Sequence, residues 1–320
     1  MRRRRFLQGL VASCGLAVTQ PLLGDADATK PLKTAIGLNG FASSSRKYGK
    51  EYPIREILAF ARDTGFDGVE LVQRWPDADY PKASDTARIK QIRDLYAGFD
   101  LQVFSIQTGA AGAFDPNEGK RQEWLEQFRE HARFASAIGA DCIGMWPGGG
   151  LRGQSIEAAI RTLAKSFDAA ATIAKDLNLI AAFEIEPPFV FNTEGHLRQI
   201  LQQAQNPALK TIYDPSHFDL MSGSRGRPHE MLQRIGVENI GYVHLTDTDG
   251  TLRDGGTSKH LACGDGHVDI SKSLDTLLHG GFGGWVMIDA WEIPDVYDAC
   301  VKGKRAIEAA MARAKGSSSP

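Results

Sequence analysis

The stretch Leu-Lys-Thr-Ile-Tyr-Asp-Pro-Ser-His, residues 209–217, decides the fold class when it is compared with the stretches on either side. In it an apolar, β-rich run ends in an ionisable residue, Asp214, and comparable runs lead to Glu184 and His244. Glu184 lies 30 residues before Asp214, which lies 30 residues before His244. Because one strand-and-helix unit of an α/β barrel takes roughly 30 residues, the spacing predicts equivalent positions on adjacent strands.

Eight short apolar runs alternate with segments of helical period along the chain. Most runs are continuously apolar, as expected for strands that are buried on both faces of a parallel sheet. Between two of them, Ser155 is placed to cap a helix with one apolar stripe. The pattern predicts a single-domain (β/α)₈ TIM barrel over residues 29–315. The expected strands are Thr34–Leu38, Gly68–Val72, Leu101–Ile106, Cys142–Met145, Leu179–Glu184, Leu209–Tyr213, Ile240–Leu245 and Trp285–Ile288.

Two other architectures fit the chain poorly. An open doubly wound sheet would carry a glycine-rich phosphate-binding fingerprint after its first strand, and Gly37-Leu38-Asn39-Gly40-Phe41 is not one. A disulfide framework and a structural zinc site are also not expected, because the cysteines left after residues 1–28 are odd in number, widely spaced and without a C-x-x-C pair. They are Cys142, Cys263 and Cys300. The glycine- and serine-rich end, residues 316–320, is expected to be a disordered tail.

Residues 1–28 are predicted to be a twin-arginine signal peptide. The run Arg2-Arg3-Arg4-Arg5-Phe6-Leu7 contains R-R-x-F-L, and Ala26-Asp27-Ala28 offers a cleavage site after an apolar stretch. That stretch is too short and interrupted to span a bilayer. We therefore expect export to the periplasm, with lipid anchoring at Cys14 as a minor alternative.

The charge balance argues against a nucleic-acid partner. The chain has 37 basic and 39 acidic residues, and removal of four Arg and two Asp with residues 1–28 leaves 33 and 37. No block of like charge remains, so the mature chain lacks the basic surface that nucleic acids require. The expected partner is a small-molecule carbohydrate, and assembly into a homo-oligomer is left open.

A group of ionisable residues at strand ends carries the predicted chemistry. Active sites of TIM barrels lie at the C-terminal ends of the strands, where Glu184, Asp214, His244 and Asp289 fall. Three carboxylates crowded in an apolar barrel mouth would repel each other and raise their pKa values unless a cation neutralised them. We therefore predict one bound divalent ion, and the ligand types suit Mn²⁺, Mg²⁺, Co²⁺ or Zn²⁺ without deciding among them.

These motifs resemble the xylose isomerase-like TIM barrel superfamily, commonly called sugar phosphate isomerases/epimerases, over essentially the whole mature chain. In that family strand 5 ends in a ligand Glu, strand 6 in D-x-x-H, strand 7 in H-x-x-D and strand 8 in Glu, with G-x-G before the last unit. The resemblance implies that the four strand-end residues ligate the metal and that His217 contacts the substrate. The motifs fall on Glu184, Asp214 with His217, His244 with Asp247, Gly264-Asp265-Gly266, and Asp289.

Two departures from the family pattern concern the catalytic groups. Asp289 stands where the ketose epimerases of the family have Glu, and its shorter side chain is expected to ligate the metal but to reach the substrate poorly. Glu186 shares a side of its strand with Glu184, so it is a candidate acid or base, as is Glu292. The alternative for Glu186 is a salt bridge to a loop arginine. The catalytic candidates are thus Glu184, Glu186 and Asp289.

Residues that follow the strands are expected to line a sugar pocket. The alternative for the tryptophans is a place on the rim, where they would cover the core, and Asp247 would orient His244 or bind Arg253. The predicted substrate-binding residues are His217, Arg253, Gln107, Trp146 and Trp291, and further pocket candidates are Trp75, Lys259 and His260.

We expect a divalent-metal-dependent isomerase or epimerase that acts on a keto-sugar through an enediolate intermediate. The metal would act as a Lewis acid on adjacent hydroxyl and carbonyl oxygens, and a carboxylate would take the proton α to the carbonyl. Loss of a β-substituent instead would make the protein a lyase or hydratase, for example on a 3-keto-glycoside. The periplasmic address argues against a phosphorylated substrate, although Arg225 and Arg227 could bind a sugar acid.

Two further functions are an abasic-site nuclease and a non-catalytic sugar-binding barrel. Abasic-site nucleases share this fold family and carry D-x-H after strand 7, where this chain has Asp247-Thr248-Asp249, and they carry histidines at strand ends 2 and 3, where Gln107 ends strand 3. That function is therefore excluded. A non-catalytic barrel, in which the metal only holds a sugar, stays open.

Overall fold

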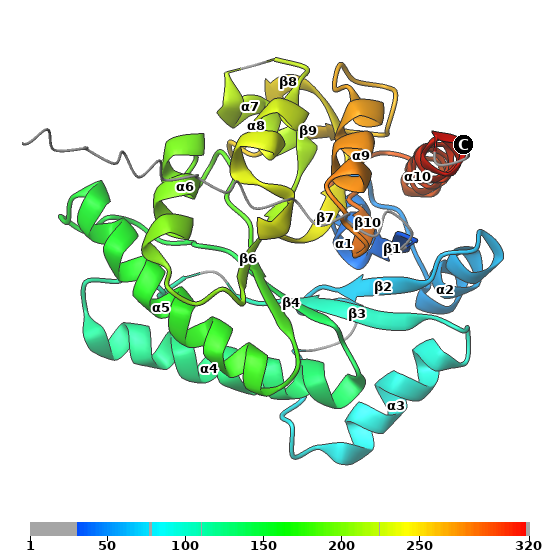
Figure 1. The fold of residues 1–320 in the computed structure, drawn as a ribbon. Helices are drawn as coiled ribbons and strands as arrows, with labels where there is room; N and C mark the ends of the chain where they lie inside the picture. Colours follow the sequence, from blue (N-terminus) through cyan, green and yellow to red (C-terminus); the bar gives the residue numbers. More distant parts are fainter. Residues whose placement is uncertain (1–30, 77–78, 110, 224, 318–320) are drawn as a thin grey trace, which may run out of the picture.

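The computed structural model describes residues 31–76, 79–109, 111–223 and 225–317. Eight parallel strands close into a barrel in the order β1-β10-β7-β6-β5-β4-β3-β2 (Figure 1). This confirms the predicted (β/α)₈ fold class. The barrel strands are β1 (Lys33–Gly37), β2 (Gly68–Leu71), β3 (Gln102–Gln107), β4 (Cys142–Met145), β5 (Ile180–Phe183), β6 (Leu209–Tyr213), β7 (Ile240–Leu245) and β10 (Trp285–Ile288).

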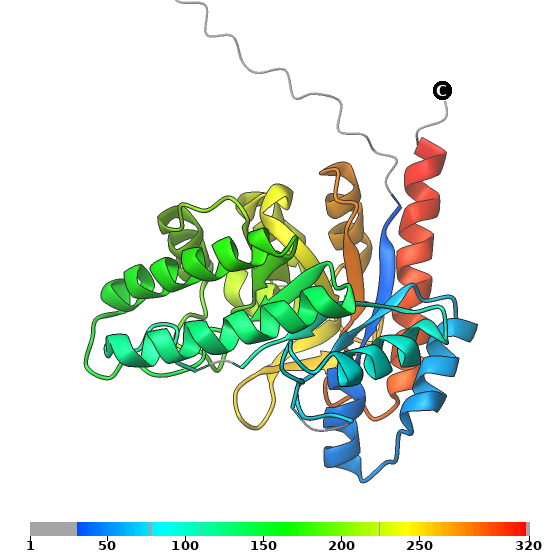
Figure 2. The same cartoon turned by 90° about the horizontal axis from the view of Figure 1, so that it is seen from below.

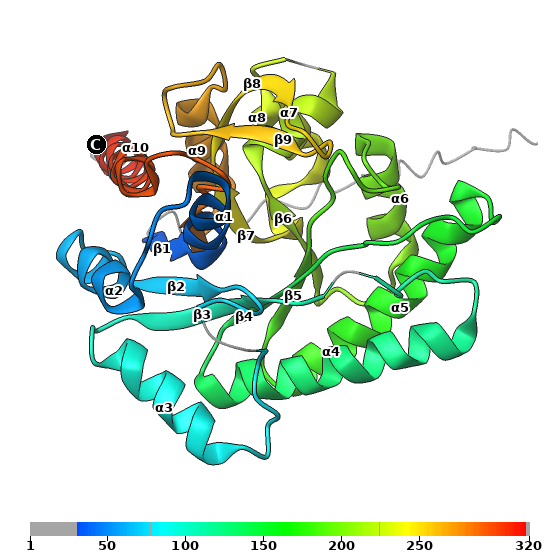
Figure 3. The same ribbon diagram turned by 180° about the vertical axis from the view of Figure 1, so that it is seen from behind.

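Helices connect the strands and cover the outside of the barrel (Figures 1 and 3). Ser155 caps α5 as predicted, because its side chain accepts a hydrogen bond from the backbone N–H of Ala158. The helices are α1 (Leu38–Tyr48), α2 (Ile54–Asp63), α3 (Thr86–Ala97), α4 (Glu118–Ile138), α5 (Ile156–Asp176), α6 (Glu194–Gln203), α7 (Pro215–Ser222), α8 (Pro228–Ile235), α9 (Ile270–His279) and α10 (Val296–Ser317).

The strand boundaries agree with the sequence at β4, β6, β7 and β10 and differ elsewhere by one residue at one or both ends. The clearest difference is at β5, which ends at Phe183 and not at Glu184. The backbone N–H of Glu184 still donates to Met145, but Pro187 and Pro188 follow closely. Since proline has no N–H to donate, the strand cannot continue, and Glu184 and Glu186 lie on the segment that leaves the barrel.

The Gly-rich insertion after β7 contains an antiparallel hairpin that the sequence pattern did not predict. Its strands are β8 (Asp247–Leu252) and β9 (Ser258–Leu261), and Thr248 pairs with His260. The hairpin contacts α7 beside the barrel (Figure 3). β8 reads Asp-Thr-Asp-Gly-Thr-Leu, which lacks the apolar pattern of a buried strand.

The inside of the barrel is filled below the strand ends by apolar and aromatic side chains. Phe104 stacks on Trp285 with ring centroids 4.6 Å apart and meets the ring edge of Tyr242 at 5.6 Å. This packed layer closes the barrel from below, so any site must lie above it at the C-terminal ends. The layer consists of Ala35, Phe104, Cys142, Ala182, Ile212, Tyr242, Trp285 and Met287.

The last helix, α10, runs beside β1 (Figure 2). It continues through Gly316 to Ser317, so these two residues of the predicted disordered tail are helical, and residues 318–320 lie outside the described part. The predicted signal peptide, residues 1–28, also lies outside it. Among the helices of the described residues, none has the length and apolar character to cross a membrane.

Candidate metal centre

The four predicted metal ligands meet at one end of the barrel. They lie at or directly after the C-terminal ends of β5, β6, β7 and β10, which are consecutive strands of the closed sheet, so the four residues converge. Glu184, Asp214, His244 and Asp289 are each 5% exposed or less. Three carboxyl groups and an imidazole therefore share one buried space.

The distances in this cluster fit a divalent ion. His244 Nδ1 lies 2.9 Å from Glu184 Oε1 and 3.8 Å from Asp289 Oδ2. One ligand atom from each of Glu184, Asp214 and His244 lies within 4.8 Å of the other two. Within the described part of the chain, the buried Oδ2 of Asp214 has no hydrogen-bond partner. A buried, unpartnered carboxylate oxygen is costly, and an ion at this position would remove that cost.

The pKa values reveal the same need for positive charge. Burial, and then the charge of Glu184, raises the pKa of Asp214 to about 7. Burial also raises the pKa of Asp289 to about 7, against the opposing effect of His244. Burial likewise favours a higher pKa for Glu184, but the neighbouring His244 more than offsets it and lowers the pKa to about 2. Without a cation, ionisation of Asp214 and Asp289 is therefore disfavoured, and a divalent cation would hold both carboxyl groups ionised.

Glu70 on β2 also belongs to the centre, although it was not expected from the sequence. Its Oε2 lies 3.1 Å from Nε2 of His244, on the opposite side of the ring from Glu184. Burial alone would lower the pKa of His244, but the carboxylates of Glu184 and Glu70 raise it well above its usual range. A carboxylate on the far nitrogen orients a ligating histidine and increases its basicity. The available signal was a charged residue inside the apolar run Gly-Val-Glu-Leu-Val.

Gln107 takes a different position from the predicted one. Its amide Nε2 donates to Glu70 Oε1 at 3.2 Å and to the hydroxyl of Tyr242 at 3.0 Å. It is not among the residues that line the cavity above the centre. In place of the predicted substrate contact, the structure shows that Gln107 supports the Glu70 carboxylate.

Replacement of Glu70 by Gln is expected to weaken metal binding without unfolding the protein. The neutral amide keeps the size of the side chain but removes the charge that orients His244. Loss of such a partner costs about 10–100-fold in metal affinity. Competition with a chelating dye measures the affinity, and an unchanged affinity would contradict this role for Glu70.

A cavity of about 380 Å³ opens directly above the centre. Its aromatic walls include Trp146, whose Nε1 donates to Glu184 Oε2 at 2.8 Å, and Trp291. Both tryptophans and His217 thus lie where the sequence predicted a sugar pocket. The lining residues are Asn39, Trp146, Glu184, Glu186, Pro188, Phe189, His217, Asp254, Gly255, Thr257, His260, Asp289, Trp291 and Glu292.

Glu186 lies in the cavity wall and makes no salt bridge to an arginine within the described chain. Its Oε2 accepts a hydrogen bond from Thr257 Oγ1 at 2.5 Å and lies 3.5 Å from Nε2 of His217. Burial raises the pKa of Glu186. A carboxyl group with a raised pKa, in contact with a histidine and facing a cavity, is suited to proton transfer.

The cationic side chains considered for substrate binding are engaged elsewhere. Arg253 donates to the carbonyl oxygens of His260 and Glu292 at 3.3 and 2.9 Å, so its predicted substrate contact is replaced by a brace between the hairpin and the end of β10. Lys259 pairs with the carboxylate of Asp249, and Arg225 donates to the backbone carbonyl oxygen of Asp249. Arg227 pairs with Glu230. Among the described residues that line the cavity, none is Lys or Arg.

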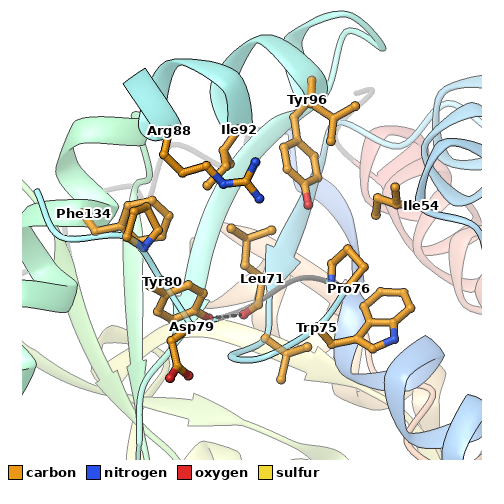
Figure 4. A pocket seen from close by; sticks show the side chains of 13 residues that line it. Ile54, Leu71, Trp75, Pro76, Asp79, Tyr80, Arg88, Ile92, Tyr96 and Phe134 are labelled. Carbon is orange, nitrogen blue, oxygen red and sulfur yellow. Dashed lines mark hydrogen bonds between the residues drawn. The ribbon is translucent and has the colours of Figure 1, made fainter. Parts of the chain in front are cut away.

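A second, smaller cavity of about 100 Å³ lies between the end of β2 and α3 (Figure 4). Trp75 faces this space together with Leu71 and Tyr96, so it does not line the cavity above the centre. The hydroxyl of Tyr80 donates to the carbonyl oxygens of Leu71 and Gln107 (Figure 4 shows the first). This packing ties the segment after β2 to the ends of β2 and β3.

Asp247 holds a turn, in place of the predicted contact with His244 or Arg253. Its two carboxylate oxygens accept hydrogen bonds from four backbone N–H groups, at 2.8–3.1 Å. Two of the donors are the glycines of the G-x-G motif, Gly264 and Gly266, and the others are Thr248 and Val268. The strand 7 aspartate and the G-x-G motif thus form one structural unit that anchors the hairpin.

Replacement of Gly266 by Ala is expected to destabilise the protein by about 1–3 kcal/mol, as overpacking typically does. A Cβ there would overlap the Asp247 carboxylate and the carbonyl oxygen of Thr248. Urea unfolding measures the effect. Gly150→Ala is the matched control, because nothing lies within 4 Å of its added Cβ. Equal stability of the two variants would refute the close approach.

Comparisons with known proteins agree with this architecture. Curated relatives described as inosose dehydratase include those of Histophilus somni strain 129Pt, 22% identical over 285 residues (81% of this chain and 90% of the relative), and of Klebsiella pneumoniae strain 342, 22% identical over 304 residues (86% and 96%).

Solved structures show the same fold at low sequence identity. A structure described as IOLI protein with a binding zinc atom has a TM-score of 0.68 and 15% identity, covering 88% of this chain and 99% of its own. An L-ribulose 3-epimerase has a TM-score of 0.66 and 18% identity, covering 90% and 98%. The family described as Xylose isomerase-like TIM barrel matches residues 58–314. This chain therefore belongs to the xylose isomerase-like TIM barrel family.

Proposed function

We propose that this protein is a metal-dependent enzyme that removes the proton next to the carbonyl of a neutral, polyhydroxylated ketone, as an isomerase or epimerase does. The observation that carries the proposal is Glu186. Its carboxyl group is buried, has a raised pKa and faces the cavity beside the ligand cluster. A general base of this kind, next to a Lewis-acid site, is the arrangement that enolate chemistry requires.

The metal is proposed to bind Glu184, Asp214, His244 and Asp289, with Zn²⁺, Mn²⁺, Mg²⁺ and Co²⁺ as candidates. When bound, it would supply Lewis-acid polarisation of the substrate carbonyl. The IOLI structure, which shares the fold, contains a bound zinc atom and is in keeping with a metal in this barrel. Trp146 fixes Glu184 by its hydrogen bond, and Glu70 fixes the ring of His244.

The cavity favours an uncharged substrate. Five of its described lining residues are acidic and none is Lys or Arg, so a phosphate or carboxylate would find no basic side chain in the cavity wall to pair with. Trp146 and Trp291 offer flat faces for the apolar side of a sugar ring. Thr257 and His217 hold the Glu186 carboxyl group in the cavity wall. We propose that this group reaches a sugar ring that packs against the two tryptophans.

A dehydratase is the second candidate, favoured by the geometry of Asp289. Asn39 Nδ2 and the backbone N–H of Trp291 both donate to its Oδ1 at 3.0 Å, which ties this short side chain to the barrel rim. Epimerisation needs proton-transferring groups on opposite faces of the substrate. Elimination of water needs only one, because a single carboxyl group can remove the α-proton and then protonate a hydroxyl that leaves on the same face. The inosose dehydratases among the relatives support this alternative.

Nuclear magnetic resonance in D₂O tests both candidates. The metal-loaded protein is incubated with ketohexoses, inososes and 3-keto-glycosides. Deuterium at the α-carbon together with an epimeric or isomeric product supports the first candidate, and loss of the β-substituent supports the second. A metal-loaded protein that binds these ligands but yields neither exchange nor product would be a non-catalytic sugar-binding barrel, and the proposal would be wrong.

We also propose that the chain is exported by the twin-arginine route. Replacement of both Arg3 and Arg4 by Lys is expected to trap the precursor in the cytoplasm, because the arginine pair is the recognised signal. Cell fractionation followed by immunoblotting measures the distribution. Normal export of the double variant would contradict the proposed location.

A further inference from the structure

We propose that Ser258, on strand β9 of the hairpin, is a positioning residue for His217. Together with Ser216 it holds a proton on Nδ1 of the His217 ring, so that Nε2 is left to accept a hydrogen bond from a hydroxyl group of the substrate. The family resemblance implies a substrate contact for His217 but gives no role to either serine. The inference deepens the proposed function, and only its substrate step rests on that function.

The His217 ring lies between the hairpin and the cavity. Its side chain is 3% exposed and belongs to the cavity lining. Nδ1 lies 2.8 Å from the hydroxyl oxygen of Ser258, whereas Nε2 lies 3.5 Å from Oε2 of Glu186, which also lines the cavity. The ring nitrogen that carries the proton therefore decides what the cavity wall offers to a ligand.

The polarity of the hydrogen bonds around His217 is fixed at Asp214 by the backbone. Oδ1 of Asp214 accepts from the backbone N–H groups of Ser216 at 2.7 Å and of His217 at 3.2 Å. A backbone N–H can only donate, so Oδ1 is an acceptor, and any proton on this carboxyl group would lie on Oδ2. The hydroxyl of Ser216, 2.6 Å from Oδ1, therefore donates to it as well.

The two serine hydroxyls carry this polarity to His217. Each hydroxyl has a single proton. Because Ser216 donates its proton to Asp214, the contact of 2.7 Å between the two serine oxygens requires Ser258 to donate. The contact of 2.8 Å between Ser258 and Nδ1 of His217 then requires the ring N–H to donate. Both serines are fully buried, so a contact without a hydrogen between its two atoms would be costly.

The result is a defined acceptor in the cavity wall. A neutral imidazole has one N–H, so a proton held on Nδ1 leaves a lone pair on Nε2. The nearby oxygens of Glu186 and Asp214, at 3.5 and 3.7 Å, accept hydrogen bonds when they are ionised and cannot then satisfy this lone pair. A substrate hydroxyl can donate to it, whereas a carbonyl or ether oxygen cannot. The substrate therefore turns a hydroxyl, and not its carbonyl, toward His217.

Nuclear magnetic resonance of the ring nitrogens tests the tautomer without a substrate. The purified protein, labelled with ¹⁵N-histidine and supplied with Mg²⁺ alone, is measured in mildly alkaline buffer, where an ordinary imidazole is neutral. Two-bond ¹H–¹⁵N correlations distinguish a protonated from a bare ring nitrogen, and the spectrum of His217→Gln identifies the signals of His217. We expect a protonated Nδ1 and a bare Nε2. A wild type with a proton on Nε2, alone or together with one on Nδ1, would overturn the proposal.

Interruption of the serine pair should move the proton. In Ser258→Ala, Nδ1 loses its acceptor, so a large share of the His217 rings should change to the Nε2–H tautomer. Ser216→Ala should cause the same change by another route, because it frees the Ser258 proton to be donated to Nδ1. Two folded variants that keep the wild-type pattern would show that the serines do not set the tautomer.

Two further variants separate this role from general packing. Ser258→Thr keeps the hydroxyl and should keep the wild-type ring pattern. Ser273→Ala is the matched control, because Ser273 is also fully buried but accepts a hydrogen bond from Tyr213, and it should leave His217 unchanged. A change of tautomer in Ser273→Ala as large as that in Ser258→Ala would mean that the effect is a general one, and the proposal would be wrong.

Kinetic measurements test the substrate step. Ser258→Ala should raise KM by about 2- to 10-fold, the effect of losing one hydrogen bond of ordinary strength, with a much smaller change in kcat. Ser258→Thr should restore the KM. An unchanged KM in Ser258→Ala, with the tautomer altered, would contradict the contact with a substrate hydroxyl. The spectra need no turnover, so an inactive protein with the expected ring pattern would refute the proposed function and still support the role of Ser258.

Discussion

Replacement of Asp214 by Asn is expected to abolish stable metal binding while the barrel stays folded. The amide keeps an oxygen that can accept from the backbone N–H groups of Ser216 and His217, so the cap of α7 is preserved. The ligand oxygen, however, is lost. Metal affinity should fall by more than the roughly 100-fold upper range of an outer-sphere change. Since Lewis-acid catalysis contributes several kcal/mol, kcat/KM should fall by at least about 10³-fold.

Metal analysis, circular dichroism and steady-state kinetics measure these effects together. Asp115→Asn is the matched control, because Asp115 is also a buried carboxylate but pairs with Arg152 outside the cavity lining. It should keep both metal and activity. A folded Asp214→Asn variant with wild-type metal content would mean that this cluster does not bind the metal, and the proposed metal site would be wrong.

Replacement of Glu186 by Gln is expected to keep the metal and lose turnover. The Glu186 carboxyl group is not one of the proposed metal ligands. The amide of Gln has nearly the same shape, so packing and metal content should hardly change. Loss of a general acid–base group typically costs about 10²–10⁴-fold in kcat. Because the substrate would still bind, KM should change much less than kcat.

Solvent deuterium exchange adds a measurement that is specific to proton transfer. It should disappear in Glu186→Gln, whereas Glu194→Gln, on the surface and paired with Arg234, should exchange like the wild type. If Glu186→Gln is as active as the wild type, the base must be Glu184, Asp289 or Glu292. An epimerase mechanism with ligand carboxylates as acid and base would then be favoured over the one proposed here.

Much of the centre could be predicted from local sequence. An apolar run that is buried on both faces predicts a parallel strand, and a strand in a barrel places its last residue at the active-site end. The equal spacing along the chain then predicts that Glu184, Asp214 and His244 lie together. Asp289 followed from the same rule, although an insertion lengthened the interval. The fold class and the four proposed ligands therefore needed only periodicity and chain order.

The partners of those residues were decided by closure of the barrel. Glu70 comes from a strand 174 residues before His244 in the chain, and no local pattern relates the two. Gln107 and Arg253 were placed correctly along the chain but not around the barrel axis, so their contacts differ from the predicted ones. Which side of a barrel end a side chain faces depends on strand tilt and on the neighbouring strands, which are long-range properties.

The hairpin shows the same division most clearly. Its polar sequence carries no signal of a buried strand, and His260 was therefore only a weak candidate from its position. Antiparallel pairing of β8 with β9 beside α7 turns His260 toward Asp214 and brings Ser258 to His217. Sequence alone determined the strands, their order along the chain and the candidate ligands at the strand ends, because these follow from local periodicity. Tertiary structure alone decided which ionisable groups share the buried space, because burial and hydrogen bonding depend on segments that are distant in the chain.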